Sequence, residues 1–216
     1  MMLEINAVSK KYTKGDKVFV ALDNVSLQVS KGEFIVLVGP SGSGKSTLLN
    51  TIGGLNQPDS GNVIFNGKDI YLLKQNESDM YRRKNIGFVF QQFHLIPYLT
   101  VYENILAVCD GNGEKGRIDE LLQSCALFDL KNKYPSELSV GEKQRTAFIR
   151  AIITQPDILL ADEPTGNLDP DNSNILMQMI ADFHNQGGTV FLVSHDPEVS
   201  KFATRQIRLK SGLLFD

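Results

Sequence analysis

Two patterns of apolar residues predict the strands of this chain. In the first third, residues 3–9 and 18–29 alternate apolar and polar side chains, which is typical of strands with one buried face. Later, short continuous apolar runs occupy residues 34–38, 86–90, 158–161 and 190–193. Such runs suit strands that are covered on both faces, as in a parallel sheet.

Helical patterns lie between the apolar runs and complete the prediction of the fold. They cover residues 45–55, 101–108, 117–126, 140–154 and 174–185. Alternating strands and helices predict an α/β fold with a parallel core sheet. Asn66-Gly67 between two short apolar segments predicts a hairpin, so the N-terminal third should form an antiparallel β subdomain. We expect one domain over residues 1–216, with a helical subdomain inserted at about residues 92–153.

A glycine-rich loop follows the buried run 34–38 and opens the next helix. Its sequence fits G-x-x-x-x-G-K-[ST], and strand–loop–helix is the context that this motif requires. Glycines let backbone N–H groups line an anion site, the lysine adds a charge for phosphates, and the Ser46 hydroxyl can ligate Mg²⁺. The alternative is a glycine-rich turn that only caps a helix. The predicted ATP-binding residues here are Gly39, Ser41, Gly42, Ser43, Gly44, Lys45, Ser46 and Thr47.

Two acidic residues end the buried run 158–161. The carboxyl ends of parallel strands are where such sheets bind ligands, so Asp162 is predicted to hold Mg²⁺ and Glu163 to act as general base. The alternative is a pair of acids that merely ends a strand at the surface. The phosphate loop upstream favours the catalytic interpretation.

A second candidate anion site begins at Ser139. Ser139 and Glu142 form an S-x-x-E capping box, which predicts a helix start, and Gly141 lies in the first turn. A capped helix N-terminus with a small residue can bind an anion, although capping alone is a structural device. One triphosphate needs one phosphate-binding site, so a single chain with one ATP would have no use for this second site.

From these residues the chain resembles the ATP-binding cassette (ABC) ATPases, a P-loop NTPase family, over essentially its whole length. Residues 138–142 resemble the family signature, which in that family closes over the ATP of a second subunit. The resemblance therefore implies a head-to-tail homodimer that sandwiches ATP and Mg²⁺. It also implies roles for four further residues. These are Gln91 as a sensor of Mg²⁺ and γ-phosphate, Asp169 in the D-loop, His195 as the switch histidine, and Tyr12 as the residue that stacks on adenine.

Each of these assignments has a plain alternative. His195 could simply end a strand, Tyr12 could be ordinary surface, and Gln92 beside Gln91 leaves a one-residue ambiguity. Val140 departs from the family pattern, which commonly has glycine there. Because Gly141 is retained and Val140 can point away, we expect activity to survive.

Residues 162–169 are similar to the branch of the family that includes the lipoprotein-release ATPase LolD and the macrolide exporter MacB. That resemblance implies an ATP-hydrolysing subunit that powers a separate membrane permease in export or lipoprotein release. Residues 93–99 are unusually apolar for a loop, which indicates either core packing or a docking surface for the permease. The alternative function is an ATPase like the cell-division protein FtsE, which regulates a membrane partner without transport.

Composition and motif content exclude several other classes of protein. With 22 basic and 25 acidic residues the net charge is −3, which argues against nucleic acid as a partner. No apolar run approaches the roughly 18 residues that span a bilayer, and no secretory signal begins the chain. The guanine-reading N-K-x-D motif is absent after Asn132-Lys133. We therefore expect a cytoplasmic protein that attaches to the membrane face through its permease.

Overall fold

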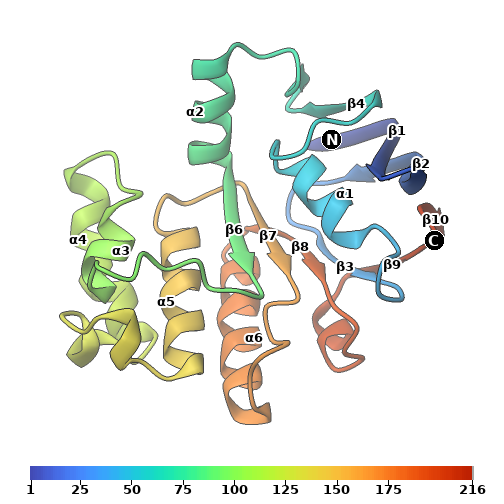
Figure 1. The fold of residues 1–216 in the computed structure, drawn as a ribbon. Helices are drawn as coiled ribbons and strands as arrows, with labels where there is room; N and C mark the ends of the chain where they lie inside the picture. The colour runs from blue at the N-terminus through green and yellow to red at the C-terminus, as the bar shows by residue number, and fades with distance from the viewer. Residues whose placement is uncertain (216) are drawn as a thin grey trace.

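The computed structural model describes residues 1–215, apart from the side chains of residues 112 and 113, and contains two sheets (Figure 1). The strands are β1 (Leu3–Lys14), β2 (Lys17–Val29), β3 (Phe34–Val38), β4 (Ser60–Phe65), β5 (Lys68–Asp69), β6 (Ile86–Phe90), β7 (Ile158–Asp162), β8 (Thr189–Val193), β9 (Arg205–Lys210) and β10 (Leu213–Phe215). The helices are α1 (Lys45–Ile52), α2 (Gln75–Asn85), α3 (Val101–Leu106), α4 (Asn112–Ser124), α5 (Val140–Ile152) and α6 (Pro170–Asn185). Short 3₁₀ helices are η1 (Phe128–Leu130), η2 (Pro135–Glu137) and η3 (Val199–Phe202).

The larger sheet has the order β10-β9-β3-β8-β7-β6. Neighbouring strands from β9 to β6 pair in parallel, and only β10 is antiparallel. The adjacent strands β3, β8, β7 and β6 are the continuous apolar runs, and most of their residues are buried. This confirms the predicted α/β fold with a parallel core.

Alternate residues of the central strands pack into two separate cores. Ile35 and Leu37 of β3 join the core that contains α1 and the small sheet. Phe34 and Val36 point the other way, into a core shared with α5 and α6. Because strand side chains alternate between faces, α1 covers one face of the sheet and α5 and α6 cover the opposite one (Figure 1).

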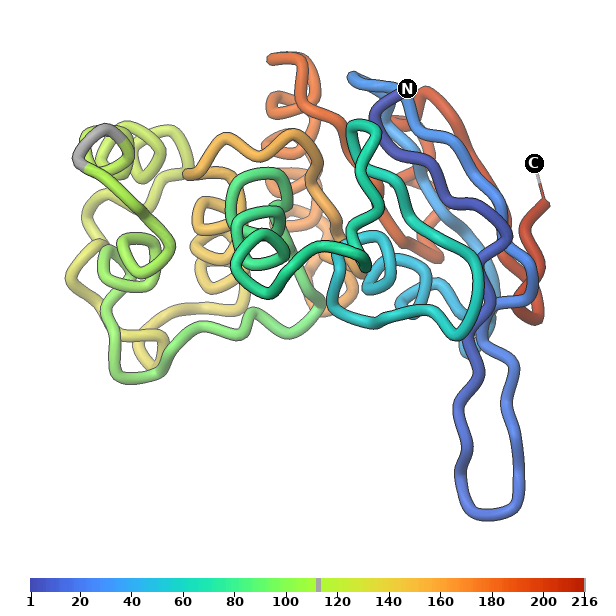
Figure 2. Tube along the Cα trace, turned by 90° about the horizontal axis from the view of Figure 1, so that it is seen from above, coloured from blue at the N-terminus to red at the C-terminus, as the bar shows by residue number. Residues whose placement is uncertain are grey.

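The N-terminal strands form the smaller sheet, in the antiparallel order β2-β1-β4-β5. Asn66 and Gly67 both have positive φ between β4 and β5, as the two-residue hairpin requires. The far ends of β1 and β2 form a long hairpin that projects away from the rest of the molecule (Figure 2).

A third core holds the helical segment between β6 and β7. Val101, Ile105 and Ile118 from α3 and α4 are buried together with Ile149 and Ile153 from the region of α5. α5 thus contributes to this core and to the core against the large sheet, so it joins the helical segment to the sheet. No helix in the described part of the chain is long and apolar enough to cross a membrane.

Several elements were not predicted or begin at another residue than predicted. α2 escaped detection because its sequence is strongly polar and Tyr81 is its only buried residue. β9 has only two buried residues, Ile207 and Leu209, among polar and charged ones, and none of the three residues of β10 is buried. α4 begins at Asn112 rather than at residue 117, because the Glu114 carboxylate accepts hydrogen bonds from the N–H groups at the helix start.

Candidate functional site

The phosphate loop connects β3 to α1, and two of its glycines cannot be replaced without moving other strands. Gly39 and Gly44 have φ of +157° and +105°, in the region that favours glycine. A Cβ on Gly39 would lie 2.1 Å from the Leu209 carbonyl oxygen, and one on Gly44 would lie 2.0 Å from that of Ala21. β2 and β9 therefore hold the loop in its curved form.

Polar groups of the loop are arranged to meet an anion. The Ser43 hydroxyl is buried and has no hydrogen-bond partner among the described residues, so it is a free donor inside the loop. The buried Lys45 ammonium donates to the carbonyl oxygens of Gly39 and Pro40, at 2.9 and 3.1 Å, and so spans the loop. Ser41, Gly42 and Ser46 are exposed, and Gly44, the N-cap of α1, and Thr47 are half-buried.

Ser46 and Asp162 meet at the ends of α1 and β7. Burial raises the pKa of Asp162, and the polar interaction with the Ser46 hydroxyl and the nearby Lys45 charge counteract the rise only in part. A hydroxyl and a partly buried carboxylate are hard oxygen ligands of the kind that Mg²⁺ prefers. No described cluster of three His, Cys, Asp or Glu residues forms a metal site by itself.

Glu163 and His195 form a pair across the ends of β7 and β8. His195 Nδ1 lies 3.2 Å from a Glu163 carboxylate oxygen, and the histidine side chain is 70% exposed. Glu163 has φ of +45°, which is strained for a residue with a side chain. Its N–H donates to the Val193 carbonyl at 2.9 Å, so β8 holds it in this conformation.

Gln91 begins the exposed loop that follows β6. Its carbonyl accepts a hydrogen bond of 3.1 Å from the Asn167 side chain. Its amide lies against Gly166, where an added Cβ would be 2.9 Å from Gln91 Nε2. Gln91 is thus placed beside the loop that follows Glu163.

Ser139 caps α5 as the sequence predicts. Glu142 N–H donates to the Ser139 hydroxyl at 3.3 Å, and Ser139 N–H donates to the Glu142 carboxylate at 2.7 Å. The bond from the Ser139 N–H is the main cause of the lowered pKa of Glu142. Val140 is 44% exposed, so its side chain lies at the surface in the first turn of α5.

The start of α5 is connected to Asp169 through Asn172. Arg145 donates to Asn172 Oδ1 at 2.8 Å, and Asn172 Nδ2 donates to Asp169 at 2.7 Å. Asp169 also caps α6, because it accepts from the Asn172 N–H at 3.0 Å. Gly141 leaves room for this amide, since a Cβ there would lie 2.2 Å from Asn172 Oδ1.

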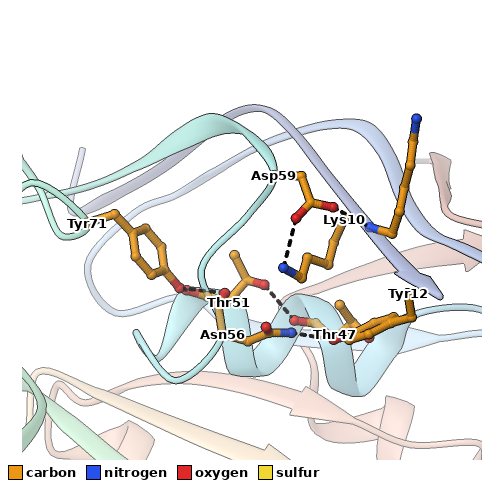
Figure 3. Close-up of polar contacts among 8 residues, drawn as sticks. Lys10, Tyr12, Thr47, Thr51, Asn56, Asp59 and Tyr71 are labelled. Carbon is orange, nitrogen blue, oxygen red and sulfur yellow. Dashed lines mark hydrogen bonds and ion pairs between the residues drawn. The ribbon is translucent and has the colours of Figure 1, made fainter.

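Tyr12 lies on β1 in the region where the projecting hairpin begins, and its side chain is 43% exposed. Its hydroxyl accepts a hydrogen bond from Asn56 (Figure 3). The Tyr71 hydroxyl lies 2.7 and 2.8 Å from the carbonyl oxygens of Thr51 and Asn56, at the end of α1. Tyr12 is therefore braced against the helix that begins at the phosphate loop, and its ring faces solvent in part.

The structure brings the phosphate loop, Asp162, Glu163 and His195 to the same edge of the large sheet, because β3, β7 and β8 are parallel neighbours. Ser139 and Gly141 begin a helix on the opposite face from α1 (Figure 1). Sequence reasoning missed Gln144 and Asn172. Gln144 had a detectable signal, since it is a polar residue one turn before Phe148 on the buried face of α5.

Comparison with known proteins agrees with this geometry. Residues 22–166 match the family model of the ABC transporter. The chain is 41% identical over 219 residues to the macrolide export ATP-binding/permease protein MacB of Chlorobaculum tepidum, and it spans 34% of that protein's length. It is 40% identical over 220 residues to the lipoprotein-releasing system ATP-binding protein LolD of Shewanella oneidensis, covering 99% of this chain and 96% of LolD.

This chain is also similar to a solved structure, the dimeric post-hydrolysis state of the ATP-binding cassette MJ0796 bound to ADP and Pi. The superposition covers 98% of this chain and 95% of the MJ0796 chain, with a TM-score of 0.90 and 40% sequence identity. By family match, by identity over the full chain and by fold, this protein belongs to the ABC transporter family, as an ATP-binding cassette with the P-loop NTPase fold.

Proposed function

We propose that this chain is the ATP-binding and ATP-hydrolysing subunit of a transporter and powers a separate membrane permease in export or lipoprotein release. One observation carries the proposal. A phosphate loop, the Ser46–Asp162 pair and the Glu163–His195 pair meet at one sheet edge. The names of the relatives MacB and LolD support the class of transport.

In this proposal the phosphate loop binds the triphosphate of ATP. Backbone N–H groups and the Ser43 hydroxyl donate to phosphate oxygens, and Lys45 contributes its charge to the β- and γ-phosphates. Tyr12 stacks on the adenine. Mg²⁺ held by Ser46, with Asp162 and Gln91 near it, would neutralise charge on the phosphates.

Glu163 takes the proton of the attacking water in the hydrolysis step. Its carboxylate is half-buried, and His195 lies 3.2 Å away, where it can contact the γ-phosphate and orient Glu163. Glu163 follows Asp162 at the end of β7, so in this proposal the base lies on the γ-phosphate side of the Mg²⁺ ligand. Gln91 then senses the γ-phosphate from the loop after β6.

A second copy of the chain completes the site in this proposal. Ser139, Gly141, Glu142 and Asp169 lie near the start of α5, which covers the other face of the sheet from α1. In a head-to-tail homodimer they would contact the ATP held by the partner's phosphate loop. ATP binding would close the dimer and hydrolysis would open it, which is a two-state cycle able to drive a membrane partner.

The permease is proposed to dock beside Gln91. A groove of about 450 Å³ lies between α2, β6 and α5, with Phe88 and Phe90 on its apolar side and Arg150 among its lining residues. Tyr98, in the apolar loop after β6, is 76% exposed, as a docking residue should be. The chain would then lie at the cytoplasmic face of the membrane, held there by the permease.

Replacing Glu163 by Gln tests the proposed function. We expect the Glu163→Gln variant to bind ATP and to hydrolyse it at least about a hundredfold more slowly, a loss of about 2.7 kcal/mol of transition-state stabilisation. It should also accumulate as a dimer with ATP in size-exclusion chromatography. Near-normal turnover in this variant would refute the assignment of the base.

A further inference from the structure

Gln144 is a buried amide at the contact between α5 and the catalytic edge of the sheet. The residue is fully buried, although glutamine is usually exposed. Its Nε2 group donates to the Phe90 carbonyl at 3.1 Å and to the Pro164 carbonyl at 2.8 Å. One side chain on α5 thus binds the backbone at the ends of two parallel strands.

Each of the two acceptor residues is the sequence neighbour of a proposed catalytic residue. Phe90 precedes Gln91, and Pro164 follows Glu163. Glu163 needs such support because its φ of +45° is strained. Its N–H donates to the Val193 carbonyl, and its own carbonyl accepts from the Gly166 N–H at 3.0 Å. Gln144 adds a hydrogen bond from α5 to the next residue, Pro164.

The side-chain carbonyl of Gln144 indicates that filling space in the core is not the reason for a glutamine at this position. Its Oε1 is buried and has no hydrogen-bond partner among the described residues, which is costly for a polar atom. A methionine of nearly the same size would fill the space without that cost. The two N–H groups are therefore the part of the side chain that the site uses.

We propose that Gln144 is a positioning residue for ATP hydrolysis, which holds Glu163 and Gln91 in register with each other from α5. It touches neither substrate nor reacting atoms. Because α5 also begins at the capped Ser139 turn, Gln144 links the turn that would face the partner's ATP to the chain's own hydrolytic groups. This inference rests on the proposed function of Glu163.

The Gln144→Met variant removes both donors and keeps the volume. We expect its kcat for ATP to fall at least about tenfold, because small displacements of catalytic groups lower rates by one to two powers of ten. Its KM and its binding of a fluorescent ATP analogue should stay within about twofold, because Gln144 is remote from the phosphate loop. Loss of structure alone would instead lower the fraction of protein that binds nucleotide, so kcat is counted per bound nucleotide.

Thr146→Val is the matched control. Thr146 is buried on the same helix, and its hydroxyl donates only to the Glu142 carbonyl within α5, at 2.8 Å. This variant also loses one buried polar group, and its kcat should stay within about twofold of the wild-type value. If Gln144→Met does not fold, Gln144→Asn keeps the amide but shortens its reach, and its kcat per bound nucleotide should be reduced.

A double variant separates this inference from the proposed function. If Gln144 acts through Glu163, Gln144→Met should lower kcat by a smaller factor in the Glu163→Gln background than in the wild type. Normal turnover of Glu163→Gln alone would overturn the proposed base and leave the inference without its target. Three results would overturn the role of Gln144 if the Glu163→Gln enzyme is slow. They are a wild-type kcat for Gln144→Met, an equal fall in kcat for Thr146→Val, and effects of Gln144→Met and Glu163→Gln on kcat that multiply independently in the double variant.

Discussion

Gly141→Ala is a change of one methyl group in the first turn of α5, and the structure predicts that it disrupts a hydrogen-bond network. The new Cβ would lie 2.2 Å from Asn172 Oδ1 and 3.2 Å from Asn172 Cβ. Asn172 cannot rotate aside freely, because Arg145 donates to its Oδ1 and its Nδ2 donates to Asp169. Relieving the clash therefore breaks both bonds.

The magnitude follows from the bond to Arg145, because Asp169 is exposed and solvent screens its bond to Asn172. Losing a hydrogen bond that has one charged partner costs about 1.5–3 kcal/mol. Alanine recovers up to about 1 kcal/mol through its higher helix propensity. The net loss of unfolding free energy is about 0.5–3 kcal/mol, which for a chain of this length lowers Tm by roughly 1–12 °C.

Thermal denaturation without nucleotide, followed by circular dichroism, measures this loss. Gly116→Ala is the matched control, because Gly116 lies in α4 with nothing within 4 Å of an added Cβ. It should raise the unfolding free energy by about 0.5–1 kcal/mol. In an Asn172→Ala background the amide is gone and only the Cβ contact at 3.2 Å remains, so Gly141→Ala should lower Tm much less there. An unchanged or higher Tm for Gly141→Ala alone would refute the reasoning.

Two further predictions concern the surface and the cap of α5. Tyr98→Ala should leave basal ATPase activity and Tm unchanged, because the side chain is 76% exposed. It should reduce the stimulation of ATPase activity by the permease in reconstituted vesicles. Unchanged stimulation would contradict docking of the permease at Tyr98. The folded pKa of Glu142 is lowered from 4.5, so its contribution is complete above that pH and is lost as pH falls through the folded pKa. Urea denaturation at several pH values measures this effect. Near neutral pH the Glu142→Gln variant should be less stable than the wild type by no more than about 1 kcal/mol, and at the acidic end of the range the two should be equally stable. A stability difference that does not change with pH would exclude this charge effect.

The sequence alone determined the elements whose residues interact with near neighbours. Continuous apolar runs located β3, β6, β7 and β8, because full burial leaves no polar face. The Ser139 cap was readable because a capping box joins residues three apart. The phosphate loop was readable because its glycines and lysine act within one turn of the chain.

Only the tertiary structure decided which groups meet. Gln144 contacts residues 54 and 20 positions away, and Asn172 contacts Arg145 27 positions away, so no local spacing marks these pairs. The pairing of His195 with Glu163 likewise depends on β7 and β8 lying side by side in parallel. α2 and β9 were missed because their apolar residues are too few to form a pattern, and packing against the rest of the chain selects their structure. Local chemistry thus predicted the groups proposed to bind ATP, and the order of strands in the sheet brings the phosphate loop and the groups after β7 and β8 together.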